Sequence, residues 1–210
     1  MIVAAAATVA GCSSSAKHRQ LTLQEMIAAD PLPLAKGAKW TYAVTATRTD
    51  GATQKEITST LTWTTEVLDA REANGIVAYR VKGWPSDLAG MNDNGGAAPV
   101  ATERTILRSG NRIIFGGPGD FAQMPTLDGA EGWFTWPVID GQKLCSSAEV
   151  VYCWKVLAID SGYRLTYYTG PDEQAFDLEP GTGIGRYFYA HHGPTDQVEA
   201  KLTSYSKPKR

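Results

Sequence analysis

Histidines, cysteines and carboxylates are the side chains of this sequence that can do chemistry, and they are sparse: three histidines and three cysteines in 210 residues. His191 and His192 are adjacent, and adjacent residues in a strand point to opposite faces of the sheet. The two rings would therefore not hold one metal ion, and we expect them to be polar surface residues beside a turn. The sequence predicts no metal site and no cofactor.

Paired carboxylates are the second chemistry to consider. Enzymes that hydrolyse glycans use two acidic side chains about 5 to 10 Å apart. Several acids fall in turn-like segments, namely Asp120, Glu131, Asp172, Glu173 and Glu179. Spacing along the chain does not fix their separation in space, so a hydrolase acting on cell-wall or extracellular glycans stays the alternative hypothesis. No serine lies in a nucleophile elbow, and we assign no catalytic residue.

A glycine run precedes the last part of the chain, with Gly181, Gly183 and Gly185 at every second position. A phosphate-binding loop would need a helix directly after the glycines, whereas an aromatic-rich strand pattern follows here. Glycines in such a pattern indicate unusual backbone angles or the close approach of a neighbour. We read the run as structural.

Cys145 and Cys153 are separated by seven residues. This spacing lets them face each other across a short hairpin, where the roughly 5.5 Å between paired Cα atoms suits a disulfide. The sequence predicts a bridge between them if the protein is exported to an oxidising compartment. Two buried free thiols are the alternative.

Six tryptophans make up the main binding potential of the chain. Trp40 and Trp63 fall on the apolar faces of predicted strands and are expected in the core. Trp84, Trp133 and Trp136 flank irregular segments, where aromatic rings line clefts and rims. We predict that these three form a ligand-binding rim for a lipid chain, a sugar ring or an apolar peptide.

Composition and charge bound the class of protein. Hydrophobic residues make up 43% of the chain, and 21 glycines and 11 prolines are compatible with an ordinary globular domain. The 20 basic and 22 acidic side chains give a net charge of -2. Without an excess of positive charge the chain is not expected to bind nucleic acid.

Periodicity predicts an antiparallel β protein. Apolar residues alternate with polar ones over residues 40–46 and 57–67, with a turn at Asp50-Gly51 between them and a hairpin signal at Asn74-Gly75. Further strands are expected over residues 76–84, 102–108, 112–115, 150–156 and 163–168, and a closing hairpin over 176–205. Residues 85–101 predict a loop, and residues 21–30 a short helix. The predicted fold is mainly β: a single, strongly curved antiparallel sheet, closed as a half-barrel, barrel or sandwich, with one short N-terminal helix.

The N-terminal residues resemble a bacterial lipoprotein signal. A short apolar run ends in Val9-Ala10-Gly11-Cys12 and is followed by serines. This resembles the lipobox, which implies that Cys12 carries diacylglycerol and a further acyl chain and anchors the protein to a membrane leaflet. The expected organisation is a signal peptide at 1–11, a flexible tether at 12–20 and one β domain at 21–210.

Two other segments resemble uncharacterised bacterial lipoproteins. They are LPLAKGAKWTY at residues 32–42 and GTGIGRY at 181–187. Some such lipoproteins have a curved sheet similar to the lipoprotein-carrier half-barrel, which shelters acyl chains. The resemblance implies a lipid-anchored protein of the bacterial cell envelope, facing the periplasm or the cell surface. We expect a non-enzymatic binding or scaffolding module for an apolar or amphipathic, lipid-like ligand or an envelope protein.

Overall fold

The structure is a computed structural model that describes residues 30–91, 97–116, 121–123, 132–135, 140–144, 153–191 and 196–207. Twelve strands and one 3-10 helix occur in these ranges. They are β1 (Lys39–Thr49), β2 (Glu56–Ala73), β3 (Ile76–Lys82), η1 (Pro85–Met91), β4 (Glu103–Ser109), β5 (Arg112–Gly116), β6 (Gly132–Thr135), β7 (Lys143–Leu144), β8 (Trp154–Ile159), β9 (Gly162–Tyr168), β10 (Asp172–Glu179), β11 (Gly183–His191) and β12 (Asp196–Ser206).

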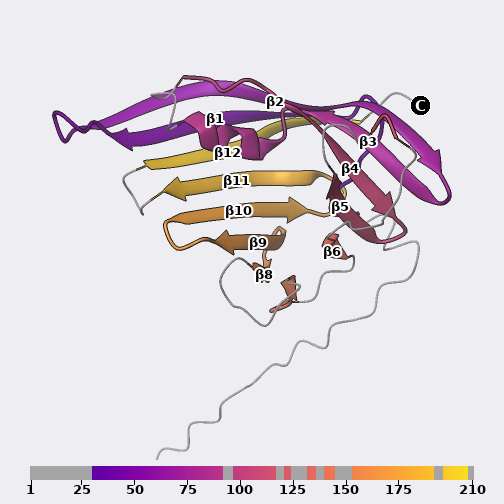
Figure 1. Cartoon of the computed structure of the whole chain (residues 1–210). Helices are drawn as coiled ribbons and strands as arrows, with labels where there is room; N and C mark the ends of the chain where they lie inside the picture. The colour runs from indigo at the N-terminus through magenta and orange to yellow at the C-terminus, as the bar shows by residue number, and fades with distance from the viewer. Residues whose placement is uncertain are drawn as a thin grey trace, which may run out of the picture.

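All twelve strands belong to one sheet, in the order β6-β5-β4-β3-β2-β1-β12-β11-β10-β9-β8-β7, and every pairing is antiparallel. The first and last strands of the chain are therefore neighbours in the middle of the sheet. Figure 1 shows the sheet bending until its two edges approach, and β6 contacts β7. The predicted single, strongly curved antiparallel sheet is confirmed, and it is nearly closed into a barrel.

The hairpin predicted at Asn74-Gly75 joins β2 to β3. Both residues have positive φ angles, 54° and 74°, as a two-residue turn of the type that matches strand twist requires. Asparagine and glycine adopt this conformation at low cost, which explains why this pair marks the turn. The turn at Asp50-Gly51 is also confirmed, between β1 and β2.

The hydrophobic core lies on the concave face of the sheet. Along β1, the alternate residues Trp40, Tyr42, Val44 and Ala46 are all buried, whereas Thr45 between them is exposed. Trp63 on β2 is buried as well, so the core assignment of Trp40 and Trp63 is confirmed. Full burial of one large apolar side chain contributes about 1.5 to 3 kcal/mol, and this row is repeated across the sheet.

The start of the described chain closes one end of the curved sheet. The backbone carbonyl of Asp30 accepts a hydrogen bond from Gly181 N at 2.7 Å, and its carboxylate pairs with Arg108. Leu32 and Leu34 are buried just after it. The predicted helix at 21–30 falls almost wholly outside the described residues, and Asp30 itself is not helical.

Helix η1 differs from the loop that was predicted at residues 85–101, of which the structure describes 85–91 and 97–101. Residues 85–91 form a 3-10 helix, and its Leu88 and Met91 are fully buried. The loop prediction is wrong here because tertiary packing, not local periodicity, holds this segment. No helix among the described residues is long and apolar enough to cross a membrane.

Candidate functional site: the concave face and its open end

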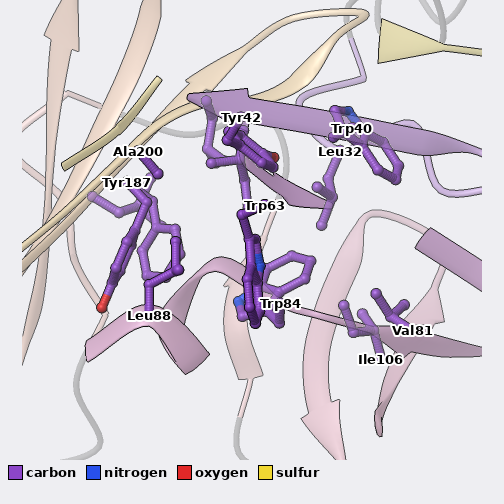
Figure 2. Close-up of a cluster of buried hydrophobic side chains, with 14 of the residues drawn as sticks. Leu32, Trp40, Tyr42, Trp63, Val81, Trp84, Leu88, Ile106, Tyr187 and Ala200 are labelled. Carbon is purple, nitrogen blue, oxygen red and sulfur yellow. The ribbon is translucent and has the colours of Figure 1, made fainter. Parts of the chain in front are cut away.

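The interior of the curved sheet is filled by the connection between β3 and β4. Helix η1 contacts β11 and β12, and its Leu88 belongs to the same buried cluster as Trp63, Trp84 and Tyr187. Figure 2 shows Leu88 reaching from the helix toward Tyr187, and Trp84 beneath Trp63. This part of the concave face holds the protein's own side chains in the place where a ligand-carrying half-barrel would hold an acyl chain.

Trp84 thus lies in the core, with 1% of its surface exposed, and not on a rim. Its ring packs edge-on against Phe115 at 5.4 Å and lies 6.3 Å from Phe176. Trp133 belongs to β6, with its side chain outside the described part of the structure, and Trp136 lies outside the described residues altogether. The ligand contacts of these three tryptophans stay a prediction.

Gly83 directs the chain from β3 into this connection. Its carbonyl oxygen accepts hydrogen bonds from Trp63 Nε1 at 2.8 Å and from the buried Thr65 hydroxyl at 2.6 Å. Its φ angle is +70°, and a Cβ at this position would stand 2.3 Å from the backbone oxygen of Thr64. A glycine is needed here because the backbone of the connection passes so close to β2.

A buried carboxylate then fixes η1 to the start of β4. The Asp87 side chain is 4% exposed, and it lies 2.5 Å from Nη2 of Arg104. It also accepts hydrogen bonds from the backbone N–H and the hydroxyl of Thr102, at 2.9 and 2.8 Å. These bonds satisfy the charge that the helix buries, so η1 is held over the sheet by polar as well as apolar contacts.

The concave face becomes more exposed and more polar toward the C-terminal ends of β9 and β11 and the N-terminal end of β10. Side chains two or four residues beyond the core residues Val156, Leu165, Phe176 and Tyr187 lie on the same face but are only half-buried. We call this set the mouth band; it consists of Trp154, Tyr167, Gln174, Tyr189, Asp172 and His191.

Register and ring contacts make the mouth band continuous. Gln174 is paired with Tyr167 on one side and with Tyr189 on the other. The ring of Trp154 lies 5.1 Å from that of Tyr167 and 5.6 Å from that of Phe176. Aromatic faces and hydrogen-bonding groups thus alternate across four neighbouring strands.

Asp172 joins several side chains of the mouth band. Its Oδ1 lies 2.5 Å from His191 Nδ1 and accepts a hydrogen bond from the Tyr189 hydroxyl at 2.9 Å. Its Oδ2 accepts one from the Thr169 hydroxyl at 2.8 Å. The hydrogen bonds from His191, Thr169 and Tyr189 lower the pKa of Asp172, so the carboxylate is ionised near neutral pH.

An ion-pair ladder on the outer face supports the same strands. Arg164 of β9 donates two hydrogen bonds to the buried carboxylate of Asp177, at 2.6 and 2.7 Å, and this pairing raises the pKa of Arg164. Nη1 of Arg186 on β11 lies 3.8 Å from Oδ2 of Asp177, and Arg186 also bonds Glu199 of β12 at 2.6 Å. The side chains of four neighbouring strands, β9 to β12, are thereby joined on the outer face.

The acids that the sequence singled out on β10 do not share one site. Asp172 lies on the concave face, whereas its neighbour Glu173 lies on the outer face and accepts a hydrogen bond from the Tyr168 hydroxyl at 3.1 Å. Glu179 is at the opposite end of β10. Asp120 and Glu131 lie outside the described residues. Within the described ranges, no group of three or more histidine, cysteine or acidic side chains is placed to hold a metal.

A separate hollow of about 370 Å³ opens beside β2. It is lined by Thr62, Trp63, Thr64, Glu66, Lys82 and Ala101. Of its two charged residues, Glu66 lies 3.1 Å from Lys39, and Lys82 is the register partner of Glu66 in the sheet. Nothing in its lining indicates a particular ligand.

The sequence contained Asp172 and His191 as separate candidates, a turn acid and a surface histidine, but it did not pair them. The structure places them opposite each other in β10 and β11. A signal was present in Gly185, because a glycine inside a strand often marks a bulge. No sequence pattern pointed to Tyr167, Gln174 or Tyr189, because their shared face depends on the strand register.

The chain matches no protein-family model and no curated protein sequence. Among solved structures it is similar to an exported protein with a YmcC-like fold from Bacteroides fragilis, at 13% identity and a TM-score of 0.40, over 84% of this chain and 98% of that one. It is also similar to a lipoprotein from Parabacteroides distasonis, at 9% identity and a TM-score of 0.36, again over 84% of this chain and 98% of that one.

Proposed function

We propose that the protein is a lipid-anchored binding module of the bacterial cell envelope, which holds an amphipathic ligand or an envelope protein without transforming it. The observation that carries this proposal is the division of the concave face. Its middle is filled by η1 and Trp84, whereas the mouth band beyond it combines half-exposed aromatic rings with hydrogen-bonding groups. Such a surface suits a ligand with both apolar and polar faces.

The anchor part of the proposal rests on Cys12 and its lipobox context. An acyl chain contributes about 0.8 kcal/mol per buried methylene, so two or more chains hold a domain stably on a bilayer. The described domain begins at Asp30, which bonds Gly181 in the turn between β10 and β11. Asp172 and His191 lie at the other ends of these strands, about 25 Å away at the rise of an extended strand. An anchored protein would therefore carry the mouth band at the end remote from its tether.

The predicted disulfide agrees with export to an oxidising compartment. β7 and β8 pair Lys143 with Lys155 and Leu144 with Trp154. Cys153 directly precedes Trp154, whereas Cys145 lies outside the described residues, so the bridge stays a prediction. Cys153 is buried at the start of β8, a position suited to a structural bridge.

The anchor is tested by expressing the full chain in a bacterial host and separating membranes from soluble fractions after a high-salt wash. The wild-type chain is expected in the membranes and Cys12→Ser in the soluble fraction. Ser13→Ala is the matched control, because it changes the neighbouring residue and leaves the acceptor thiol, and it should stay with the membranes. Sedimentation of Cys12→Ser with the membranes would show that another feature holds the protein there.

A further inference from the structure

The mouth band has the chemistry of a surface that binds a polyhydroxylated ring. A saccharide presents apolar C–H groups on the faces of its ring and hydroxyl groups around its edge. Trp154, Tyr167 and Tyr189 supply aromatic surface, and their hydroxyls and indole add polar edges. Gln174 offers both a donor and an acceptor, and Asp172 offers acceptors only. The mouth band thus offers aromatic surface for the faces of such a ring and hydrogen-bonding groups for its hydroxyls.

The band is organised before any ligand arrives. Asp172 is held from three sides by His191, Tyr189 and Thr169. Gln174 stands between Tyr167 and Tyr189 in a regular antiparallel ladder. An Asp172 side chain fixed in this way loses little conformational entropy on binding, which favours even a small, strongly hydrated ligand.

Other ligand classes fit the band less well. An acyl chain would have to cover the ionised Asp172 and the amide of Gln174, which costs free energy without compensating hydrogen bonds. A phosphate or other anion would meet Asp172 directly, and Arg48, the arginine on the same row of the sheet, is opposite Asp196. A neutral ligand with many hydroxyl groups has neither difficulty.

We propose that the mouth band binds a saccharide unit of an envelope or extracellular glycan, with Tyr167 and Trp154 against the ring and Gln174 and Asp172 at its hydroxyl groups. The inference rests on the proposed function, because it names the ligand class of that binding module. It assigns a glycan-binding role without glycan hydrolysis.

The strand geometry provides matched controls for a test. Tyr167 and Tyr168 are adjacent tyrosines on opposite faces: Tyr167 contacts Trp154 in the mouth band, whereas Tyr168 lies on the outer face beside Lys155. Gln174 and Glu173 form a second pair of the same kind. The full chain carrying Cys12→Ser would be titrated with chitotetraose, cellotetraose, maltotetraose and xylotetraose at millimolar concentration, with saturation-transfer NMR and calorimetry as readouts.

We expect at least one of these oligosaccharides to bind. Tyr167→Ala and Gln174→Ala should each weaken that binding at least about tenfold, the loss of one good contact. Tyr168→Ala and Glu173→Gln should leave it unchanged, and circular dichroism would verify that each variant is folded. Binding that survives both Tyr167→Ala and Gln174→Ala would place the saccharide elsewhere and overturn the proposal.

Two further probes separate the alternatives. Binding of choline or decanoate at the mouth band, with no binding of any oligosaccharide, would overturn the saccharide proposal in favour of a cationic or an acyl ligand. Absence of binding by all the oligosaccharides would overturn it as well. Neither result would touch the membrane anchor, whose failure is seen only in the fractionation of Cys12→Ser.

Discussion

Trp40 and Gly183 are in contact across the sheet: a Cβ on Gly183 would stand 2.8 Å from the indole nitrogen of Trp40. That nitrogen donates a hydrogen bond to the carbonyl oxygen of Thr182 at 2.5 Å, and Gly183 has a φ angle of +105°. Strand β1 is thereby fixed to the glycine run at the start of β11. The contact explains why the run contains a glycine at this position and joins the two ends of the chain.

Replacement of this glycine should therefore be costly. Gly183→Ala introduces both an unfavourable backbone angle and a clash with Trp40, and we expect it to lower the free energy of unfolding by about 2 to 4 kcal/mol. Urea denaturation followed by circular dichroism would measure the change. Gly51→Ala is the control, since Gly51 has no atom within 4 Å of its would-be Cβ and no positive φ. Equal stability of the two variants would contradict the close-approach explanation.

Helix η1 should depend on its buried carboxylate. Asp87→Ala removes the partner of Arg104 and of the Thr102 backbone N–H, so we expect a loss of about 2 to 4 kcal/mol of stability. Because the same segment carries the buried Trp84, tryptophan emission should also shift to longer wavelength. The comparison is Glu103→Ala, which removes only an exposed pair 3.9 Å from Arg80 and should cost at most about 1 kcal/mol. An unshifted emission maximum in Asp87→Ala would argue against this attachment of the helix.

The network around Asp172 should appear in the pH dependence of stability. The pKa of Asp172 is lowered in the folded protein, mainly by the hydrogen bond with His191. The ionised carboxylate therefore stabilises the folded protein relative to the unfolded chain. This contribution is fully present above the pKa of the unfolded chain, about 3.9, and is lost in the acid range below it, as the pH falls through the lower pKa of the folded protein. The stability difference between the wild type and Asp172→Asn, taken from urea midpoints, should therefore shrink on acidification over this range. A stability difference that stays constant with pH would contradict a lowered pKa of Asp172 in the folded protein.

The cysteine pair should stabilise the exported protein. Mass mapping of non-reduced peptides should find Cys145 linked to Cys153, and a reductant should lower the free energy of unfolding by about 2.5 to 3 kcal/mol, the value expected from closing so short a loop. In Cys153→Ser, the free energy of unfolding should not change when the reductant is added. Two thiols that react with an alkylating agent in the unreduced, unfolded chain would disprove the bridge.

The strands could be predicted from the sequence because alternation and turn chemistry are local. Trp40 to Ala46 alternate strictly, and Asn74-Gly75 admits few conformations other than a tight turn. The position of Trp84 could not be predicted in this way. It follows the last regular residues of β3, and only the packing of η1 on β11 and β12 decides that it turns inward.

The pairing of Asp172 with His191 was hidden by a single extra residue. Counted outward from the turn, where Glu179 pairs with Gly183, Asp172 would stand opposite Ala190 and not His191. The register shifts by one between Asp177 and Leu178, because Gly185 on β11 is a bulge without a partner on β10. Since one residue of slip moves a whole strand's side chains to the other face, the mouth band becomes visible only once this bulge is known.

Native mass spectrometry of the full chain carrying Cys12→Ser, purified from a bacterial host without detergent, would show whether the protein is a binding module. We expect a reproducible additional mass that disappears on denaturation and is lost in Tyr167→Ala but retained in Tyr168→Ala. Recovery of the polypeptide mass alone in every preparation would contradict it.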